Sequence, residues 1–228
     1  HMVWQTSWGI TTRTIGALVM IHGDDKGLVL PPKIAPIHVV IVPIPFKGAD
    51  PVAITDKAKE YAEKLRQKGL IVILDDRQEY TPGWKFNQWE LKGIPIRIEI
   101  GPRDLKNQQV VMVRRDTGQK LFVKEADVEA TVEKLLEDIQ SSMFAKAKKA
   151  LEESITTVQN YEEFKKVLCD KGGFIKAAWC ENAACEAKIK EETTATVRIR
   201  PFKKEKPTSN CVYCGKEATE MAYFAKSY

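Results

Sequence analysis

Four cysteines near the end of the chain have the spacing of a metal-binding site. Cys180 and Cys185 are separated by four residues, Cys211 and Cys214 by two, and 25 residues lie between the two pairs. Gly215 follows the second pair and allows the tight turn that is typical of a metal knuckle. Because four thiolates complete the tetrahedral shell of zinc, this pattern predicts a structural Zn²⁺ site and not a water-activating one.

Two disulfide bonds are the competing interpretation of the same four residues. The sequence has no basic leader followed by an apolar segment, and no apolar run of about 18 residues. We therefore expect a cytoplasmic protein without a membrane contact, in which thiols stay reduced and zinc is favoured. The fifth cysteine, Cys169, follows Tyr161, Phe164 and Leu168 in a helical pattern, which indicates a small buried residue near a helix end.

A second stretch with chemical potential lies at the start of the chain and has the sequence WQTSWGITTR. Residues 4–8 favour a strand, Gly9 allows a close turn, and Thr11 or Thr12 can cap a following helix. Arg13 would then place a planar cation at a helix N-terminus, where it could stack on an adenine or bind a phosphate. The alternative is that Arg13 is an ordinary solvent-exposed helix residue.

The elements that must position these residues follow from periodicity and breakers. The predicted strands are 37–42, 70–74, 94–100, 110–114 and 120–123, and the predicted helices are one ending at Gly69, one from Thr81 to Gly93 and one from about Glu125. Asp116-Thr117-Gly118 indicates a hairpin between the last two strands. This order predicts an α/β domain with a five-stranded mixed sheet and helices packed on it.

The last part of the chain, 161–228, has the pattern of a small α+β zinc-binding domain. Its predicted strands are 174–179, 195–199 and 221–224, with a short helix over 185–191. A domain below about 80 residues gains from a metal staple. The whole chain of 228 residues has a net charge of +5, a mild bias that is compatible with a polyanionic partner and also common without one.

Three stretches together resemble prolyl-tRNA synthetase. WQTSWGITTR and its continuation to Pro32 are similar to the third signature motif of the class II aminoacyl-tRNA synthetases, in the form found in the prolyl family. TPGWKF and WELKG, within 81–93, resemble the anticodon-binding domain of the same enzymes. The stretch after Cys185 and the cysteine quartet resemble the archaeal and eukaryotic-like type of this family, which ends in a zinc domain.

This resemblance implies a division into four parts. The expected parts are the C-terminal remnant of a class II catalytic domain over 1–36, the anticodon-binding domain over 37–140, a helical connection over 141–160 and the C-terminal zinc-binding domain over 161–228. The resemblance also implies roles at the catalytic end. Thr11 and Arg13 would contact ATP, which binds with Mg²⁺; Ser7, Trp8 and Gly9 would wall the aminoacyl-adenylate pocket; and the terminal carboxylate of Tyr228 would reach toward the active site.

Anticodon contacts are carried over to Glu90, Arg97, Arg103 and Asp104, the last two on a turn formed by Gly101 and Pro102. The chemistry suits a proline anticodon, because guanine offers N–H donors to a carboxylate and two acceptors to an arginine fork. The competing interpretation is an intramolecular pair between Glu90 and Arg97 on a solvated face.

The family resemblance implies a function for the parent protein. It is a proline–tRNA ligase that activates proline with ATP, transfers it to tRNA(Pro) and is expected to be a homodimer at full length. Because the first two class II motifs do not precede Trp4, we expect the chain as given not to activate proline. The alternatives are a freestanding tRNA- or RNA-binding accessory protein, and a zinc-stabilised scaffold that docks partners on the helix Glu125–Glu153.

Overall fold

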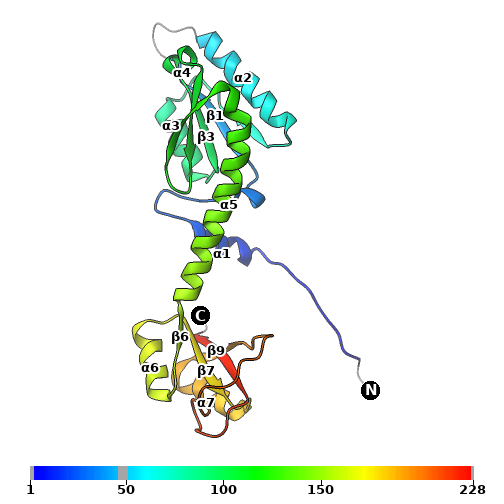
Figure 1. Cartoon of the computed structure of the whole chain (residues 1–228), viewed down its shortest axis with the longest axis vertical. Coiled ribbons are helices and arrows are strands. Elements are labelled where there is room, and N and C mark those ends of the chain that lie inside the picture. The colour runs from blue at the N-terminus through cyan, green and yellow to red at the C-terminus, as the bar shows by residue number, and fades with distance from the viewer. Residues whose placement is uncertain (1–2, 46–50, 227–228) are drawn as a thin grey trace. The chain divides into compact units, whose positions relative to one another are not determined.

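The computed structural model describes residues 3–45 and 51–226 of the chain. The chain forms two compact units that divide between Ala147 and Lys148, and each is described by itself (Figure 1). In the described part of the chain, no helix combines the length and the apolar character that a membrane span requires.

The first unit is built on a five-stranded mixed sheet. Its strands are β1 (Val39–Pro43), β2 (Val72–Leu74), β3 (Ile96–Ile100), β4 (Gln109–Arg114) and β5 (Lys120–Lys124), in the spatial order β2-β1-β3-β4-β5. β1 is parallel to β2 and β3, whereas β4 is antiparallel to both of its neighbours. The predicted five-stranded mixed sheet is therefore confirmed.

Helices cover both faces of this sheet (Figure 1). The helices of this part of the chain are α1 (Arg13–His22), α2 (Pro51–Gln67), α3 (Pro82–Leu91), α4 (Pro102–Lys106) and α5 (Val128–Glu153), with short 3₁₀ turns at Pro32–Ile34 and Glu125–Asp127. Of these, α2 and α5 pack on one face of the sheet and α3 on the other. In β1, Val39 and Ile41 pack with α2 and α5, while Val40 and Val42 pack on the other face with Trp89 of α3. Both faces of β1 are buried because alternate residues point to opposite helical layers.

Two local predictions for the first unit were wrong. Residues 4–8 form no strand, because no neighbouring strand in the described residues offers hydrogen bonds to them, and Trp4 and Trp8 are almost fully exposed. The turn at Gly101 continues into the helix α4, since Pro102 occupies its first position and the Asp104 carboxylate accepts a hydrogen bond from Gly101 N at 3.0 Å.

The second unit is a four-stranded sheet with two helices. Its elements are β6 (Ile155–Thr157), α6 (Tyr161–Asp170), β7 (Phe174–Trp179), α7 (Ala183–Thr193), β8 (Ala195–Ile199) and β9 (Glu220–Lys226), and the strand order is β6-β7-β9-β8. β6 pairs in parallel with β7, and the other pairings are antiparallel. Its core is separate from that of the first unit and includes Phe164, Ile175 and Phe224.

Two predictions for this part of the chain also differ from the structure. The connection over 141–160, predicted to be helical, contains the end of α5 and also the strand β6, which is too short to show a clear alternation. Cys169 is exposed and not buried. It follows Leu168 on α6 and therefore lies about 100° around the helix from that buried side chain.

Candidate functional site

The four predicted metal ligands meet in the second unit. Their sulfur atoms all lie within 4.8 Å of one another, and Cys180 Sγ is 3.7 Å from both Cys185 Sγ and Cys214 Sγ. Four sulfurs bound to zinc at about 2.3 Å form a tetrahedron with edges of about 3.8 Å. The separations fit one ion and are far beyond the ~2.05 Å of a disulfide bond, so the disulfide interpretation is not supported.

Local hydrogen bonds hold both halves of the quartet. Cys180 directly follows β7, and Cys185 lies in the first turn of α7, where Asn182 caps the helix by accepting a hydrogen bond from Ala184 N at 2.8 Å. In the second half, Cys211 O accepts a hydrogen bond from Gly215 N at 3.0 Å, and Gly215 has a φ of 68°. A residue with a side chain would be strained in this left-handed conformation, whereas glycine adopts it freely, which is what the predicted turn requires.

Burial and a backbone hydrogen bond shift the pKa values of the cysteines in opposite directions. Burial raises the pKa of Cys185 to about 12 and also raises the pKa of Cys180. In contrast, a hydrogen bond from the backbone N–H of Lys216 lowers the pKa of Cys214 to about 7. A bound divalent cation compensates the cost of burying thiolates. The quartet could therefore hold a metal ion and is compatible with zinc.

Glu192 connects the second cysteine pair to two helices. Its carboxylate on α7 accepts hydrogen bonds from Tyr161 Oη of α6 at 2.8 Å and from Tyr213 Oη at 2.9 Å. Tyr213 lies between Cys211 and Cys214, and its ring meets that of Tyr161 edge to face with centroids 5.0 Å apart. These contacts restrain the knuckle beyond its own turn.

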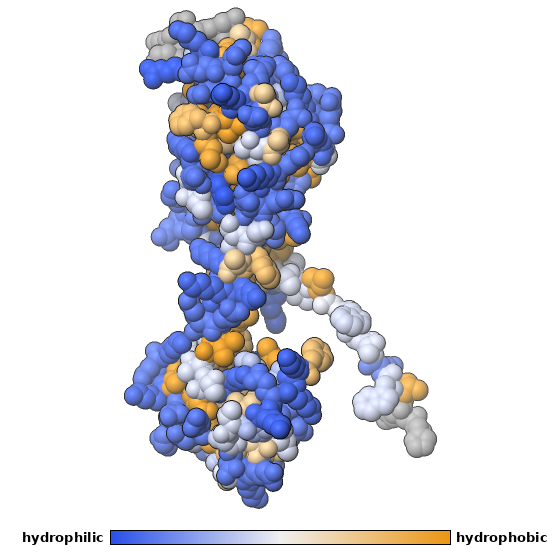
Figure 2. All heavy atoms as spheres, viewed as in Figure 1, coloured by the Kyte–Doolittle hydropathy of each residue, from blue (hydrophilic) through white to orange (hydrophobic). Residues whose placement is uncertain are grey.

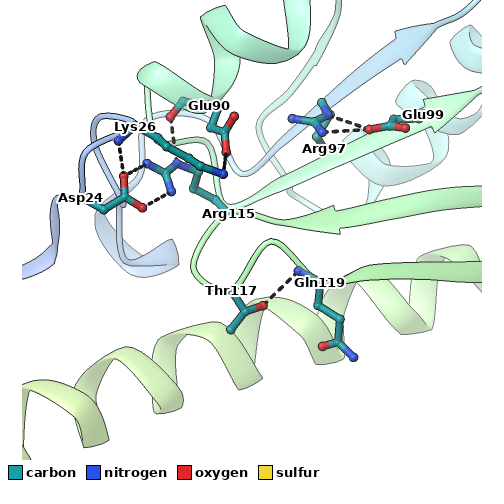
Figure 3. A network of polar contacts seen from close by, with 8 residues as sticks. All are labelled: Asp24, Lys26, Glu90, Arg97, Glu99, Arg115, Thr117 and Gln119. Carbon is teal, nitrogen blue, oxygen red and sulfur yellow. Dashed lines mark hydrogen bonds and ion pairs between the residues drawn. The ribbon is translucent and has the colours of Figure 1, made fainter. Parts of the chain in front are cut away.

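The first unit carries a polar network beside the end of α3 (Figure 3). Glu90 pairs with Lys26 at 3.2 Å, and its backbone oxygen accepts a hydrogen bond from Arg115 Nε at 2.8 Å. Arg115 also donates to both oxygens of Asp24, at 2.6 and 2.7 Å. This bidentate pair lowers the pKa of Asp24 to about 2 and joins the segment before the sheet to the β4–β5 hairpin.

Arg97 on β3 is oriented by contacts on two sides. Its Nε and a terminal nitrogen lie 3.0 and 2.9 Å from Glu99 Oε1 (Figure 3), and the guanidinium lies 4.3 Å from the centre of the Phe86 ring. The alternative of a pair between Glu90 and Arg97 is therefore wrong, because Glu99 and Lys26 take those positions. Residues two apart on a strand point to the same face, so the pairing of Arg97 with Glu99 could have been predicted from the sequence.

Glu90 and Arg97 nevertheless line one small hollow. Its walls also include Trp89 and Ile94 and the consecutive arginines Arg114 and Arg115. Arg114 is paired with Asp116 through two contacts of 3.0 and 2.8 Å. Sequence reasoning missed these two arginines, although their position just before the hairpin glycine, Gly118, could have indicated a role at the end of the sheet.

The other two predicted anticodon residues lie at the opposite end of β3. Arg103 is exposed, and within the described residues its guanidinium makes no hydrogen bond or ion pair. Asp104 is partly occupied, because Gly101 N and Gln109 Nε2 donate to its two oxygens at 3.0 and 3.3 Å. Arg97 is the second residue of β3, and Arg103 lies beyond the last residue of this strand. The four predicted anticodon residues therefore lie in two separate places, Glu90 with Arg97 at one end of β3 and Arg103 with Asp104 at the other.

The predicted nucleotide-binding residues are not gathered into a pocket. Ser7, Trp8, Gly9, Thr11 and Arg13 are all exposed. Arg13 begins α1, which confirms the predicted helix, but Thr12 occupies the cap position without a side-chain hydrogen bond, and Thr11 Oγ1 accepts only a long contact of 3.4 Å from Arg13 N. Tyr228 lies outside the described residues.

Comparison with known proteins gives two family matches. Residues 38–138 match the family described as "Anticodon binding domain", and residues 161–228 match the family described as "Prolyl-tRNA synthetase, C-terminal". The first match falls within the predicted anticodon-binding domain, 37–140, and the second coincides with the predicted C-terminal domain, 161–228. The boundaries of the four predicted parts remain predictions.

Curated relatives are similar across almost all of the chain. The proline–tRNA ligase of Alkaliphilus oremlandii is 50% identical over 225 residues, which cover 99% of this chain and 46% of the relative. Proline–tRNA ligase 2 of Clostridioides difficile has the same identity and coverage. The proline–tRNA ligase of Oceanobacillus iheyensis is 48% identical over 228 residues, covering 100% of this chain and 46% of the relative. The chain thus spans about half the length of the relatives it matches.

Proposed function

Because the chain belongs to the prolyl-tRNA synthetase family and carries its anticodon-binding and C-terminal domains, we propose that it recognises the anticodon of tRNA(Pro) for a proline–tRNA ligase. The parent activity is the ATP-dependent joining of proline to this tRNA. The observation that carries the proposal is the hollow that Glu90 and Arg97 share beside α3, together with the exposed cation of Arg103, which pairs with none of the described residues.

The two ends of β3 suit two guanines. Glu90 Oε2 can accept hydrogen bonds from the N–H groups of a guanine edge, because the one side-chain partner of Glu90 among the described residues, the largely exposed Lys26, lies at Oε1. Arg97 is held by Glu99 and Phe86, so little side-chain entropy is lost when its remaining N–H groups donate to a base. Arg103 and the free lone pairs of Asp104 would meet a second, splayed-out base.

For the C-terminal domain, we propose a structural zinc ion bound by Cys180, Cys185, Cys211 and Cys214. The support is the tetrahedral spacing of the sulfurs and the thiolate chemistry of the donor set. When bound, the ion supplies charge compensation and cross-links the strand β7, the helix α7 and the knuckle. Four protein ligands leave no position for a reacting water.

Further roles follow from the same family membership and remain proposals. Thr11 and Arg13 would bind ATP with Mg²⁺, Ser7, Trp8 and Gly9 would wall the adenylate pocket, and the Tyr228 carboxylate would lie near the active site. Their full exposure is compatible with a site whose remaining walls come from another part of the parent protein. A homodimeric parent and a cytoplasmic location belong to the same proposal.

The alternative of a freestanding RNA-binding module is less well supported. The relative from Oceanobacillus iheyensis matches the whole chain, including the stretch before the sheet. The scaffold alternative is also weakened, because one side of α5 is buried in the core through Val132, Leu136 and Ile139, and its exposed end is occupied by pairs such as Lys148–Glu152.

Binding of tRNA variants tests the proposed function. The chain should bind tRNA(Pro) with its anticodon guanines at least tenfold more tightly than the same tRNA with those guanines replaced by adenines, since a good bidentate base contact contributes about 1–3 kcal/mol of discrimination. Equilibrium filter binding at one fixed salt concentration gives both constants. Equal affinities for the two RNAs would refute the proposal.

A further inference from the structure

The end of β8 and the connection that follows it, toward the second cysteine pair, carry a concentrated positive charge. From Arg198 to Lys206 there are five basic residues and one acidic residue, a net charge of +4 in a chain whose total is +5. The net charge of these nine residues is thus almost as large as that of the whole chain. Such a concentration favours a polyanionic partner.

This connection is held in place at several points. Arg200 donates to Glu220 Oε2 at 3.1 Å and pairs with Glu181 Oε1 at 2.8 Å. In the middle, Lys176 of β7 donates to Glu205 Oε2 at 2.6 Å. At its end, Cys211 N donates to Lys216 O within the knuckle. Side chains of the basic stretch thus contact the sheet at Arg200 and at Glu205, and the cysteine quartet begins again four residues after Pro207.

The remaining cations of the stretch are not used by the fold. Arg198, Lys203, Lys204 and Lys206 are exposed and have no hydrogen bond or ion pair with the described residues. Beside them, Phe202 has a relative exposure of 109%, the highest of the large apolar side chains that the structure describes. These four cations, which have no partner among the described residues, and the exposed ring of Phe202 form a surface that we call the basic loop, with Arg198 at the end of β8 and the other residues on the connection that follows.

We propose that the basic loop is a second RNA-contact surface, which binds backbone phosphates of the tRNA while Phe202 packs on an exposed base or ribose. The inference rests on the proposed function, because that function supplies the polyanion. Lysines contact phosphates without reading sequence, and an aromatic face stacks on any base. The loop therefore adds affinity and orientation but no anticodon specificity.

An RNA partner fits this surface better than an anionic membrane. The same chain carries an anticodon-binding domain, and the two exposed large apolar residues of this stretch, Ile199 and Phe202, do not make the continuous apolar face with which amphipathic segments enter a bilayer. In Figure 2, the visible surface of the unit formed by residues 148–226 is mainly hydrophilic, with only scattered apolar side chains.

The test is the salt dependence of tRNA(Pro) binding by the full chain loaded with zinc. The triple variant Lys203→Ala/Lys204→Ala/Lys206→Ala should bind about tenfold or more weakly near 0.1 M salt. The slope of the logarithm of affinity against the logarithm of salt concentration should fall by about 2, because fewer counterions are released. Phe202→Ala should weaken binding about fivefold or more and leave the slope unchanged.

The matched control also removes three exposed lysines. In Lys148→Ala/Lys149→Ala/Lys165→Ala each lost lysine is one already paired with a glutamate on its own helix, and binding should change less than twofold. Zinc content and thermal melting verify that every variant is folded. The single variant Lys204→Glu, which reverses one charge of the basic loop, should also bind tRNA(Pro) more weakly than the parent chain.

The outcomes separate this inference from the proposed function. If the parent chain discriminates anticodon guanines but the basic-loop variants bind tRNA as the control does, only the second contact surface is refuted. If no discrimination is found, the proposed function itself fails. Loss of binding to phosphatidylserine vesicles in the triple variant, with RNA binding unchanged, would assign the loop to a lipid surface and overturn the proposal.

Discussion

Arg97 and Arg103 show how differently two arginines of one candidate site are placed. Arg97 has a side-chain exposure of 14% and neutralises Glu99, which is 9% exposed. Arg103 has no partner in the described residues and faces solvent. Replacing Arg97 therefore changes both folding and binding, because a buried carboxylate would lose its partner. Replacing Arg103 should change binding alone.

We predict that Arg103→Ala lowers the affinity for tRNA(Pro) about tenfold, as expected for the loss of one good charged contact to a base. Its unfolding free energy should stay within about 0.5 kcal/mol of the parent, as for surface substitutions without partners. Filter binding and urea denaturation measure the two quantities. Lys106→Ala, an exposed cation one turn along α4, is the matched control and should alter neither.

A second residue-scale prediction concerns acid stability and Asp24. Arg115 lowers the pKa of Asp24 from 3.8 to about 2. Because folding lowers this pKa, the ion pair stabilises the folded state above about pH 4, and the contribution is lost as the pH falls toward 2. Asp24 is half-exposed, so after allowance for solvent screening we expect about 1 kcal/mol.

Urea denaturation of Asp24→Asn and the parent at pH 7 and near pH 2 measures this contribution. The variant should be less stable at neutral pH, and the difference should disappear in acid. The neighbouring carboxylate provides the control, since Asp25→Asn removes an exposed group with no hydrogen bond to the described residues. A difference for Asp24→Asn that persists near pH 2 would contradict the role of the ion pair.

At the scale of elements, close backbone contacts join the segment 24–30 to the end of α3. Leu28 N donates to Leu91 O at 3.0 Å, and Leu30 N donates to Gly93 O at 3.3 Å. Gly93 has a φ of 73°, and a Cβ there would lie 2.6 Å from the backbone of Leu28. This glycine thus does more than end a helix, because it lets a second segment approach and places Lys26 beside Glu90.

Gly93→Ala should therefore be more damaging than a change of backbone conformation alone. Gly118 has a similar φ of 71° but no atom within 4 Å of a built Cβ, so Gly118→Ala should cost only about 1–2 kcal/mol. For Gly93→Ala we expect about 1–3 kcal/mol more, from the steric clash. Thermal unfolding of the two variants compares them directly, and equal losses of stability would disprove the packing argument.

At the scale of the whole molecule, the chain has two units with separate cores. The cysteine quartet lies wholly within the second unit, which is small enough to need a staple. The sheet of the first unit is buried on both faces, and the described residues of this unit include no metal ligand set. The two units should therefore respond differently to removal of the proposed zinc ion.

Chelation of zinc from the full chain should unfold residues 148–228 and leave the first unit folded. The physical reason is that thiolate–zinc binding contributes directly to the folding free energy of small domains. Hydrogen exchange read by mass spectrometry locates the loss of protection. Cys214→Ser should show the same pattern without chelator, and Cys169→Ser, the exposed cysteine outside the quartet, should behave as the parent. Loss of protection in the first unit would refute this separation.

Much of this protein could be predicted from its sequence. Strand and helix periodicity predicted the five-stranded sheet and its helices, because burial repeats every second residue in a strand and every third or fourth in a helix. The spacing of Cys180, Cys185, Cys211 and Cys214 predicted their meeting, because two short knuckles can close around one ion without knowledge of the fold.

The tertiary structure alone decided the partners of the charged residues. Arg115 meets Asp24 across 91 positions of sequence, and Glu90 meets Lys26 and not Arg97. Such pairings depend on which loops the packed sheet brings together. A charged side chain near several groups of opposite charge can pair with any of them, and the sequence does not say which one lies nearest. Periodicity reports which face a residue takes, but only the packing of distant segments determines what it touches there.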